Sequence, residues 1–246
     1  MRAATFDEQP GHEIFSDAER SAWHALFERH FGVADGRKAL DLASGTGVIS
    51  HLMHDLGFAV TGIDWSEAML EKARAKSRLR GSNIRFLLGD AEHTLEEDDS
   101  YDVIVTRHLV WTLVDPAAAF AEWFRVLKPG GKLLVVDGDF VSPTWATKLN
   151  KAMSGFLESI GLRKPTSPVA HMQTHRDILA RVHFSEGARA NDVSAMLART
   201  GFDPVIVDFD LRQIHAAQKK HISFAKGLER GAQHRYAICA QKPVAG

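Results

Sequence analysis

The sequence predicts an α/β fold in which a doubly wound, mostly parallel sheet of seven strands carries helices on both faces. From about residue 37 to 139, short runs rich in Val, Ile and Leu alternate with segments of helical spacing. Short turns join these segments, and the first turn is rich in glycine. Apolar strands that alternate with helices are typical of a parallel sheet covered on both faces. Right-handed crossovers then make the sheet doubly wound.

The individual elements follow from the same patterns. Strands are expected at residues 38–43, 59–64, 84–90, 101–106, 131–139, 203–210 and 234–242. Helices are expected at residues 16–32, 48–56, 66–79, 116–128, 191–201 and 213–228. Ser66 is a candidate N-cap of its helix, and Pro116 fits the first turn of another. After Asp139 the alternation stops for roughly fifty residues rich in His, Ser and Pro.

Composition excludes several classes of protein. Of the 246 residues, 45% are hydrophobic and 25% charged, and the formal net charge is −1. These values are typical of a folded soluble protein and give no global basic surface for nucleic acid. The single cysteine, Cys239, excludes a disulfide within the chain. Residues 1–15 lack the apolar core of a signal peptide, and no run is long enough to span a bilayer, so we expect a cytoplasmic protein.

The glycine-rich turn lies in "KALDLASGTGVIS", from Lys38 to Ser50. A buried strand, a Gly-x-Gly turn and a helix amino terminus form a site for a ligand that approaches the backbone closely. A nucleotide P-loop requires Gly-Lys-Ser/Thr, but Val48 and Ile49 follow Gly47. A dinucleotide-binding turn requires a third glycine or alanine, and this chain has Ser50 there.

Four motifs in order carry a family resemblance. "LDLASGTG" resembles the first motif of class I S-adenosylmethionine-dependent methyltransferases, with Asp41 as its acid and small residues where the family often has Gly-Cys. "VTGIDWSEAML" ends its strand with Asp64, which resembles the acid that binds both ribose hydroxyls. "FLLGDAEHTL" matches the turn that holds the adenine edge, and "VLKPGGKLLVVD" matches the turn before the fifth strand. The resemblance covers about residues 38–139 and implies a Rossmann-like fold.

The resemblance implies S-adenosylmethionine as cofactor and S-adenosylhomocysteine as product, with no metal. It implies cofactor-binding roles for Asp41, Ala43, Ser44, Gly45, Gly47, Asp64, Trp65, Met69, Asp90, Ala91, Glu92 and Arg107. A carboxylate suits adjacent ribose hydroxyls because it offers two acceptor oxygens. His171 and His175 stand one helical turn apart, but no third metal ligand accompanies them.

The fourth strand ends in "VIVTRHLVWTLVDP", and this edge faces the methyl group in the resembled fold. His108 and Arg107 are therefore the candidate catalytic residues, and Trp111 and His108 the candidate acceptor-binding residues. His108 is a candidate base because imidazole titrates near neutral pH. Structural alternatives stay open: an ion pair for Arg107, a hydrogen-bonded histidine and a packed tryptophan. The segment lacks the Asn/Asp-Pro-Pro-aromatic motif of amino-group methylases and the metal-binding acids of catechol-type enzymes, which favours a small-molecule acceptor.

We therefore expect one methyltransferase domain over residues 1–246. It comprises a helical cap (1–36), a cofactor-binding half (37–139), a lid insertion (140–190) and a completing segment (191–246). The lid is expected because a long insertion at the ligand edge often closes over the site. An RNA or protein methyltransferase and a non-catalytic S-adenosylmethionine-binding protein are the alternatives. No membrane or nucleic-acid partner is expected, and the sequence leaves monomer and homodimer open.

Overall fold

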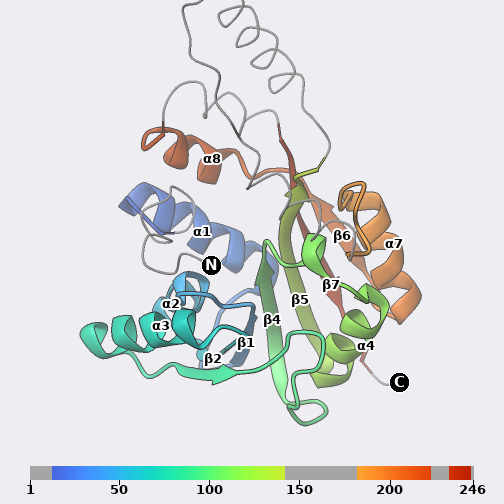
Figure 1. Cartoon of the computed structure of the whole chain (residues 1–246), viewed down its shortest axis with the longest axis horizontal. Helices are drawn as coiled ribbons and strands as arrows, with labels where there is room; N and C mark the ends of the chain where they lie inside the picture. Colours follow the sequence, from blue (N-terminus) through green and yellow to red (C-terminus); the bar gives the residue numbers. More distant parts are fainter. Residues whose placement is uncertain (1–12, 142–181, 223–232, 245–246) are drawn as a thin grey trace, which may run out of the picture.

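The computed structural model describes residues 13–141, 182–222 and 233–244 (Figure 1). Within these ranges one sheet has the strand order β3-β2-β1-β4-β5-β7-β6. The strands are β1 (Lys38–Leu42), β2 (Ala59–Asp64), β3 (Arg85–Leu88), β4 (Tyr101–Arg107), β5 (Leu127–Asp139), β6 (Val205–Asp208) and β7 (His234–Gln241). β7 pairs antiparallel with β5 and β6, and the other pairs are parallel. The predicted doubly wound, mostly parallel sheet is confirmed.

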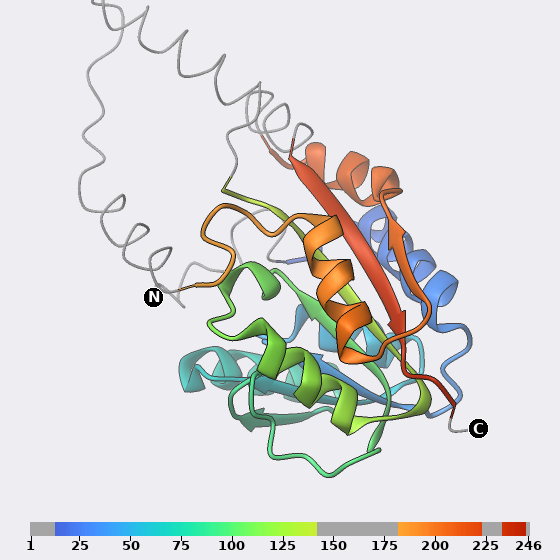
Figure 2. The ribbon, with the colours of Figure 1, turned by 90° about the vertical axis from the view of Figure 1, so that its right-hand side faces the viewer.

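Helices cover both faces of the sheet, as Figure 2 shows for α4 and α7 on the near side and α1 and α8 behind. They are α1 (Asp17–Phe31), α2 (Val48–Asp55), α3 (Glu67–Arg80), the 3-10 turn η2 (Val110–Thr112), α4 (Pro116–Val126), α7 (Ala190–Thr200) and α8 (Arg212–Lys219). Phe27, Ile49 and Ile214 pack in one large hydrophobic core, and Trp123 and Leu197 belong to a second. Burial of these apolar side chains is the main force that holds the helices on the sheet.

The residues that cap the first turns of α4 and α3 do so in different ways. The Asp115 side chain accepts a hydrogen bond from Ala118 N at 3.0 Å, and Pro116 occupies the first turn of α4, as predicted. Ser66 is the N-cap of α3, but its side chain makes no capping bond. Its backbone N–H instead donates to Asp64 Oδ1 at 2.9 Å. The start of α3 is therefore tied directly to the end of β2.

Some boundaries differ from the sequence prediction. β5 begins at Leu127, so the Lys-Pro-Gly-Gly segment lies within the strand and not before it. α8 ends at Lys219, short of the predicted end, and residues 223–228 lie outside the described residues. Most of the predicted lid, residues 142–181, and both histidines of the possible metal pair also lie outside them. The division of the chain into cap, lid and completing segment stays a prediction.

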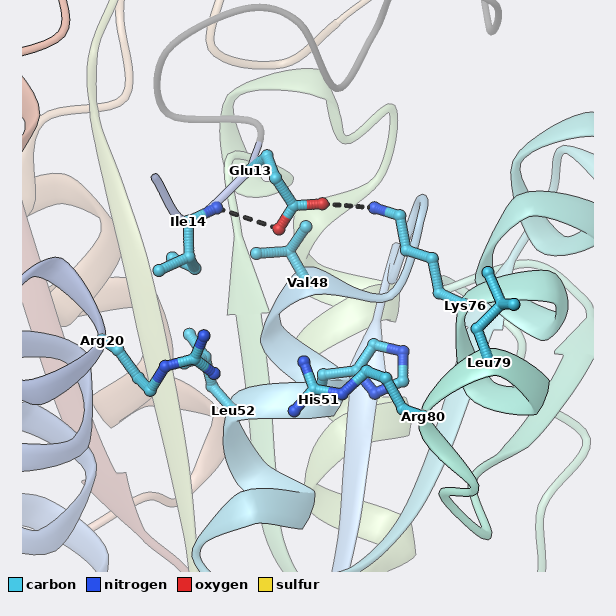
Figure 3. A pocket seen from close by; sticks show the side chains of 9 residues that line it. All are labelled: Glu13, Ile14, Arg20, Val48, His51, Leu52, Lys76, Leu79 and Arg80. Atoms are coloured by element: carbon cyan, nitrogen blue, oxygen red, sulfur yellow. Dashed lines mark hydrogen bonds and ion pairs between the residues drawn. The ribbon is translucent and has the colours of Figure 1, made fainter. Parts of the chain in front are cut away.

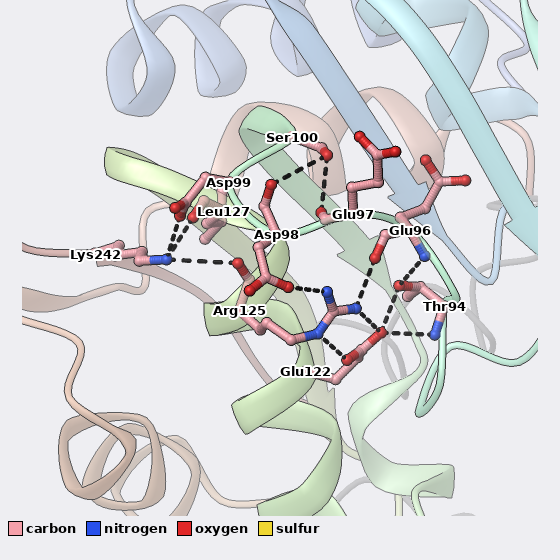
Figure 4. A network of polar contacts seen from close by, with 10 residues as sticks. All are labelled: Thr94, Glu96, Glu97, Asp98, Asp99, Ser100, Glu122, Arg125, Leu127 and Lys242. Atoms are coloured by element: carbon pink, nitrogen blue, oxygen red, sulfur yellow. Dashed lines mark hydrogen bonds and ion pairs between the residues drawn. The ribbon is translucent and has the colours of Figure 1, made fainter.

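A polar network fastens the edge of the sheet where β4 and β5 begin (Figure 4). Arg125, near the end of α4, donates to Glu122, to Asp98 and to the carbonyl oxygen of Glu96. Burial alone raises the pKa of the Glu122 carboxyl, but hydrogen bonds from Arg125 and Thr94 hold it at about 2. This network lies at the opposite end of the strands from the glycine-rich turn, so it supports the scaffold and leaves the ligand edge to other residues.

Candidate active site

The site is built where three neighbouring strands end. Leu42 of β1 pairs with Ile63 of β2 on one side and with Thr106 of β4 on the other. The next residues, Asp64 and Arg107, therefore stand at the same edge of the sheet as the turn after β1. Ligands of open α/β sheets bind outside the carboxyl ends of the strands, where the strand order reverses. Here that reversal lies between β1 and β4.

The two glycines of the turn serve different purposes. Gly47 has φ +81°, and a Cβ there would lie 2.8 Å from Phe86 Cζ. Glycine is therefore required at this position both by the backbone conformation and by packing. Gly45 has φ +56°, and a Cβ there would meet nothing within 4 Å. Gly45 thus leaves open space at the turn, where a ligand can approach the main chain.

Asp64 joins this turn to the next helix. Its Oδ2 accepts a hydrogen bond from Gly45 N at 2.8 Å, and its Oδ1 accepts one from Ser66 N at 2.9 Å. The residue is only 7% exposed, and burial raises the pKa of its carboxyl while the two backbone N–H groups lower it. Each oxygen keeps a second lone pair. The carboxylate can therefore accept two further hydrogen bonds, as a ribose diol requires.

Asp41 is a buried acid within β1, 2% exposed. Its Oδ2 accepts a hydrogen bond from the Ser50 hydroxyl at 2.5 Å. Burial raises the pKa of the Asp41 carboxyl to about 7, against the opposing effects of the Ser50 hydrogen bond and the Arg107 charge. A positively charged group that binds near this carboxyl would lower its pKa and favour its ionised form.

This raised pKa predicts a pH-dependent stability. The pKa of Asp41 in the folded protein lies above its ordinary value. Between about pH 4 and 7 the Asp41 carboxyl is therefore protonated in the folded protein and ionised in the unfolded protein. One such group makes the free energy of unfolding fall by up to about 1.4 kcal/mol per pH unit in that window. We expect Asp41→Asn to have a flatter profile between pH 5 and 7 than the wild type, by urea unfolding without cofactor. Parallel profiles would show that Asp41 does not titrate there.

The other predicted cofactor residues are distributed around the ends of β1, β2 and β3. Trp65 is 78% exposed directly after Asp64, whereas Met69 is buried on α3. Asp90 Oδ1 accepts from Glu92 N at 2.9 Å. The Glu92 carboxylate accepts hydrogen bonds from two backbone N–H groups before α4, and Ala91 O accepts from a tryptophan indole. Ala43 has φ +56°, and the buried Ser44 hydroxyl has no hydrogen-bond partner within the described part of the chain.

Aromatic rings gather beyond the end of β4. The rings of His108 and Phe140 lie 5.0 Å apart, and those of Trp111 and Phe140 lie 6.1 Å apart, centre to centre. The Arg107 guanidinium lies 5.6 Å from the centre of the Trp23 ring on α1. His108 has φ +59°, a left-handed conformation that is uncommon for a non-glycine residue. Its N–H donates to Val136 O at 3.1 Å, which helps to hold it there.

Asp137 lies on β5, beside the aromatic cluster. It was not among the site residues predicted from the sequence. It is 1% exposed and accepts hydrogen bonds from Val110 N at 2.8 Å and Gly138 N at 2.9 Å. Burial raises the pKa of its carboxyl to about 7, while the backbone hydrogen bonds lower it. The acid inside the apolar run "LLVVDGD" was the available sequence signal. Its contacts fix η2, which carries Trp111, to the end of β5.

The structure also has a cavity of about 290 Å³ lined by the segment before α1 and by α1, α2 and α3 (Figure 3). Lys76 donates to Glu13 at 2.5 Å and to the Thr46 hydroxyl at 3.3 Å. Arg20 and Arg80 both pair with Asp55. The lysine and arginine side chains that line this cavity are therefore paired with acids, and no residue predicted to bind the cofactor or the acceptor lines it.

Comparison with known proteins identifies the family. Residues 40–135 match the family model described as a methyltransferase domain. The chain is 31% identical over 186 residues to demethylmenaquinone methyltransferase of Renibacterium salmoninarum, a match that covers 72% of this chain and 76% of that protein. The chain belongs to the class I S-adenosylmethionine-dependent methyltransferases. This methyltransferase is also 36% identical over 136 residues to the ubiquinone/menaquinone biosynthesis C-methyltransferase of Shewanella oneidensis, covering 51% of this chain and 54% of that protein.

Solved structures agree on the fold. Phosphoethanolamine N-methyltransferase 2 of Haemonchus contortus, solved with S-adenosylmethionine, has a TM-score of 0.65 at 17% identity and covers 98% of this chain and 56% of its own. Geranyl diphosphate C-methyltransferase of Streptomyces coelicolor has a TM-score of 0.61 at 15% identity, covering 90% and 79%. The predicted Rossmann-like fold and S-adenosylmethionine as cofactor are confirmed. In the described ranges, no helix is long and apolar enough to cross a membrane, and no group of metal-binding side chains is found.

Proposed function

We propose that this methyltransferase acts on a small aromatic acceptor of the phenol or quinol type, bound beyond the ends of β4 and β5. The observation that carries the proposal is the ring cluster of His108, Trp111 and Phe140 beside Arg107. Aromatic side chains bind planar rings by offset or edge contacts. The similarity to a demethylmenaquinone methyltransferase supports the same acceptor class, and the similarity to a ubiquinone/menaquinone biosynthesis C-methyltransferase supports carbon as the acceptor atom.

Binding of the cofactor is assigned to the strand-end residues described above. Asp64 would accept the ribose hydroxyls, and the turn from Ala43 to Gly47 would receive the amino acid end. The segment from Asp90 to Glu92 would bound the adenine. When bound, S-adenosylmethionine supplies an electrophilic methyl group on a sulfonium. The open space at Gly45 and the two remaining acceptor positions of Asp64 fit these roles.

The residues at the acceptor end would act mainly by positioning. Methyl transfer to a nucleophilic centre depends on alignment, and fixing two reactants together can supply much of the rate. Arg107 and the aromatic cluster would fix the acceptor ring and exclude water. The left-handed backbone of His108 sets the direction of its side chain directly after the end of β4. Transfer to a ring carbon would form a carbon–methyl bond as the methyl–sulfur bond breaks and S-adenosylhomocysteine is released. The hydrogen on that ring carbon would then leave to water as a proton, so no base has to act while the new bond forms.

We expect His108→Asn to retain turnover within about tenfold of the wild type, because positioning rather than proton transfer supplies most of the rate. Asparagine tolerates the left-handed backbone that His108 adopts, so the substitution tests the imidazole without adding strain. The measurement is steady-state formation of S-adenosylhomocysteine, with cofactor affinity from calorimetry as a control. A loss of about a hundredfold in turnover at unchanged cofactor affinity would instead assign His108 as a base.

The function itself is tested by methyl transfer from labelled S-adenosylmethionine to 1-naphthol, chemically reduced 1,4-naphthoquinone, total RNA and a denatured protein extract. Label in a carbon–methyl bond of a naphthalene ring is the expected result. Label only in RNA or protein would support the macromolecular alternative, and cofactor binding without transfer would support the non-catalytic one. The proposal keeps the predicted cytoplasmic location and leaves monomer and homodimer to be distinguished by sedimentation.

A further inference from the structure

A small cavity of about 20 Å³ lies beside the proposed acceptor position. Its walls come from α1, from α8 and from the ends of β4, β5 and β7 that meet at this edge. Trp23 of α1 and Gln218 of α8 both line it, and each is only 3% exposed. Arg107 and His108 line the same cavity. The cavity therefore borders the residues at the end of β4 that are proposed to bind the acceptor.

Trp23 and Gln218 each present one unsatisfied polar atom. Within the described part of the chain, Trp23 Nε1 and Gln218 Oε1 are buried and have no hydrogen-bond partner. An unpaired buried polar group costs about 1–3 kcal/mol, so two such groups at one cavity require an explanation. One is a donor and the other is an acceptor. Together they complement a group that both accepts and donates a hydrogen bond.

The orientation of the Gln218 amide follows from its other contact. Gln218 Nε2 donates to Glu19 Oε1 at 2.7 Å, and Glu19 is fully buried. An amide nitrogen only donates hydrogen bonds and a carboxyl oxygen can accept one, so this orientation pairs the amide nitrogen with Glu19. The amide oxygen is then held away from Glu19 and remains the unpaired atom. A reversed amide would place two acceptor oxygens together.

We propose that Trp23 and Gln218 recognise a neutral hydroxyl group of the methyl acceptor. The hydroxyl oxygen would accept from Trp23 Nε1, and the hydroxyl hydrogen would be donated to Gln218 Oε1. A carbonyl or ether oxygen carries no hydrogen, so it would leave Gln218 Oε1 buried and unpaired. The pair therefore selects hydroxyl-bearing acceptors over their ketone or methyl-ether counterparts. This inference rests on the proposed function, because it takes the acceptor to bind at this edge.

The size of the cavity agrees with this assignment. A water molecule needs roughly 10–15 Å³ of such space. The volume of about 20 Å³ therefore suits a single oxygen atom and not a whole ring. A water would satisfy both side chains before the acceptor binds, and the hydroxyl of the acceptor would replace it with the same two hydrogen bonds. Sites that hydrogen-bond a substrate hydroxyl reject analogues that lack it, because their own polar groups become unpaired.

The test compares the binding of two matched probes, 1-naphthol and 1-methoxynaphthalene, to the full-length protein saturated with S-adenosylhomocysteine. Calorimetry of the wild type is expected to show naphthol binding at least about tenfold more tightly, as one unpaired buried group implies. Trp23→Phe and Gln218→Met keep much of the side-chain volume and each remove one polar atom. Each is expected to reduce the preference to about threefold or less. Gln213→Met, at an exposed position of the same helix, should keep the wild-type preference.

Equal binding of the two probes by the wild type, or no binding of either, would overturn the inference. Full preference in both folded variants would overturn the assignment to Trp23 and Gln218. The wild-type comparison remains decisive if a variant fails to fold. Failure of the proposed function is a separate result, since it would appear as hydroxyl-selective binding without methyl transfer to any ring in the labelling assay.

Discussion

Asp64→Ala should weaken the binding of S-adenosylmethionine by about a hundredfold or more. The wild-type carboxylate can accept two ribose hydroxyls, and each hydrogen bond to a charged acceptor contributes about 1.5–3 kcal/mol. The same oxygens also hold Gly45 N and Ser66 N, so the substitution loosens the turn as well as removing the ligand contacts. Calorimetric titration with S-adenosylhomocysteine measures the effect directly. Affinity within threefold of the wild type would refute the assignment of Asp64 to the ribose.

A second ligand separates recognition of the ribose from organisation of the turn. An S-adenosylhomocysteine analogue without the 2′- and 3′-hydroxyls should bind the wild type more weakly than the parent compound. In Asp64→Ala that difference should almost vanish, because the hydroxyls have lost their shared partner. If the variant binds both compounds weakly but keeps the full difference between them, Asp64 only organises the turn. Glu71→Ala, at an exposed position of α3, is the matched control.

The sequence predicted the sheet well because its strands have strong local signals. β1, β2, β4 and the later part of β5 are nearly continuous apolar runs, and such runs arise when a strand is buried on both faces. Residues 127–130 of β5 were missed because Pro129 and Gly130 are typical turn residues. Pairing of Lys132 with Gln241 on β7 and of Gly130 N with Lys242 O extends the ladder through them. That contact joins segments more than a hundred residues apart, which no local pattern encodes.

The residues proposed to bind the cofactor could be predicted from sequence because they lie in strands or follow them directly. Asp41 and Asp64 lie in or at the end of apolar runs, where an acid is conspicuous. The acceptor end was only partly accessible. Trp23 and Gln218 lie on amphipathic helices almost two hundred residues apart, and neither belongs to a motif. Their proposed role in binding the acceptor depends on the contact between α1 and α8 and on the one unpaired polar atom of each side chain in the described part of the protein.

Alanine at Gly47 should lower mainly the stability of the protein, whereas alanine at Gly45 should lower mainly its affinity for the cofactor. Gly47→Ala would place a methyl 2.8 Å from Phe86 Cζ and force a left-handed alanine at φ +81°. Overpacking costs about 1–3 kcal/mol and the backbone about 1–2 kcal/mol, so the free energy of unfolding should fall by roughly 2–5 kcal/mol. Phe86→Leu should recover part of this loss in the double variant, since it removes the clash but leaves the backbone strain.

Gly45→Ala should instead cost only the backbone part, about 1–2 kcal/mol, because nothing in the protein lies within 4 Å of the added methyl. The methyl would occupy the space in which the cofactor is proposed to approach the main chain. Cofactor affinity should therefore fall by tenfold or more, since a filled contact position excludes close binding. Urea unfolding without ligand and titration with S-adenosylhomocysteine, applied to both variants, measure the two quantities separately. If Gly45→Ala binds the cofactor as tightly as the wild type, the open side of the turn does not face the ligand.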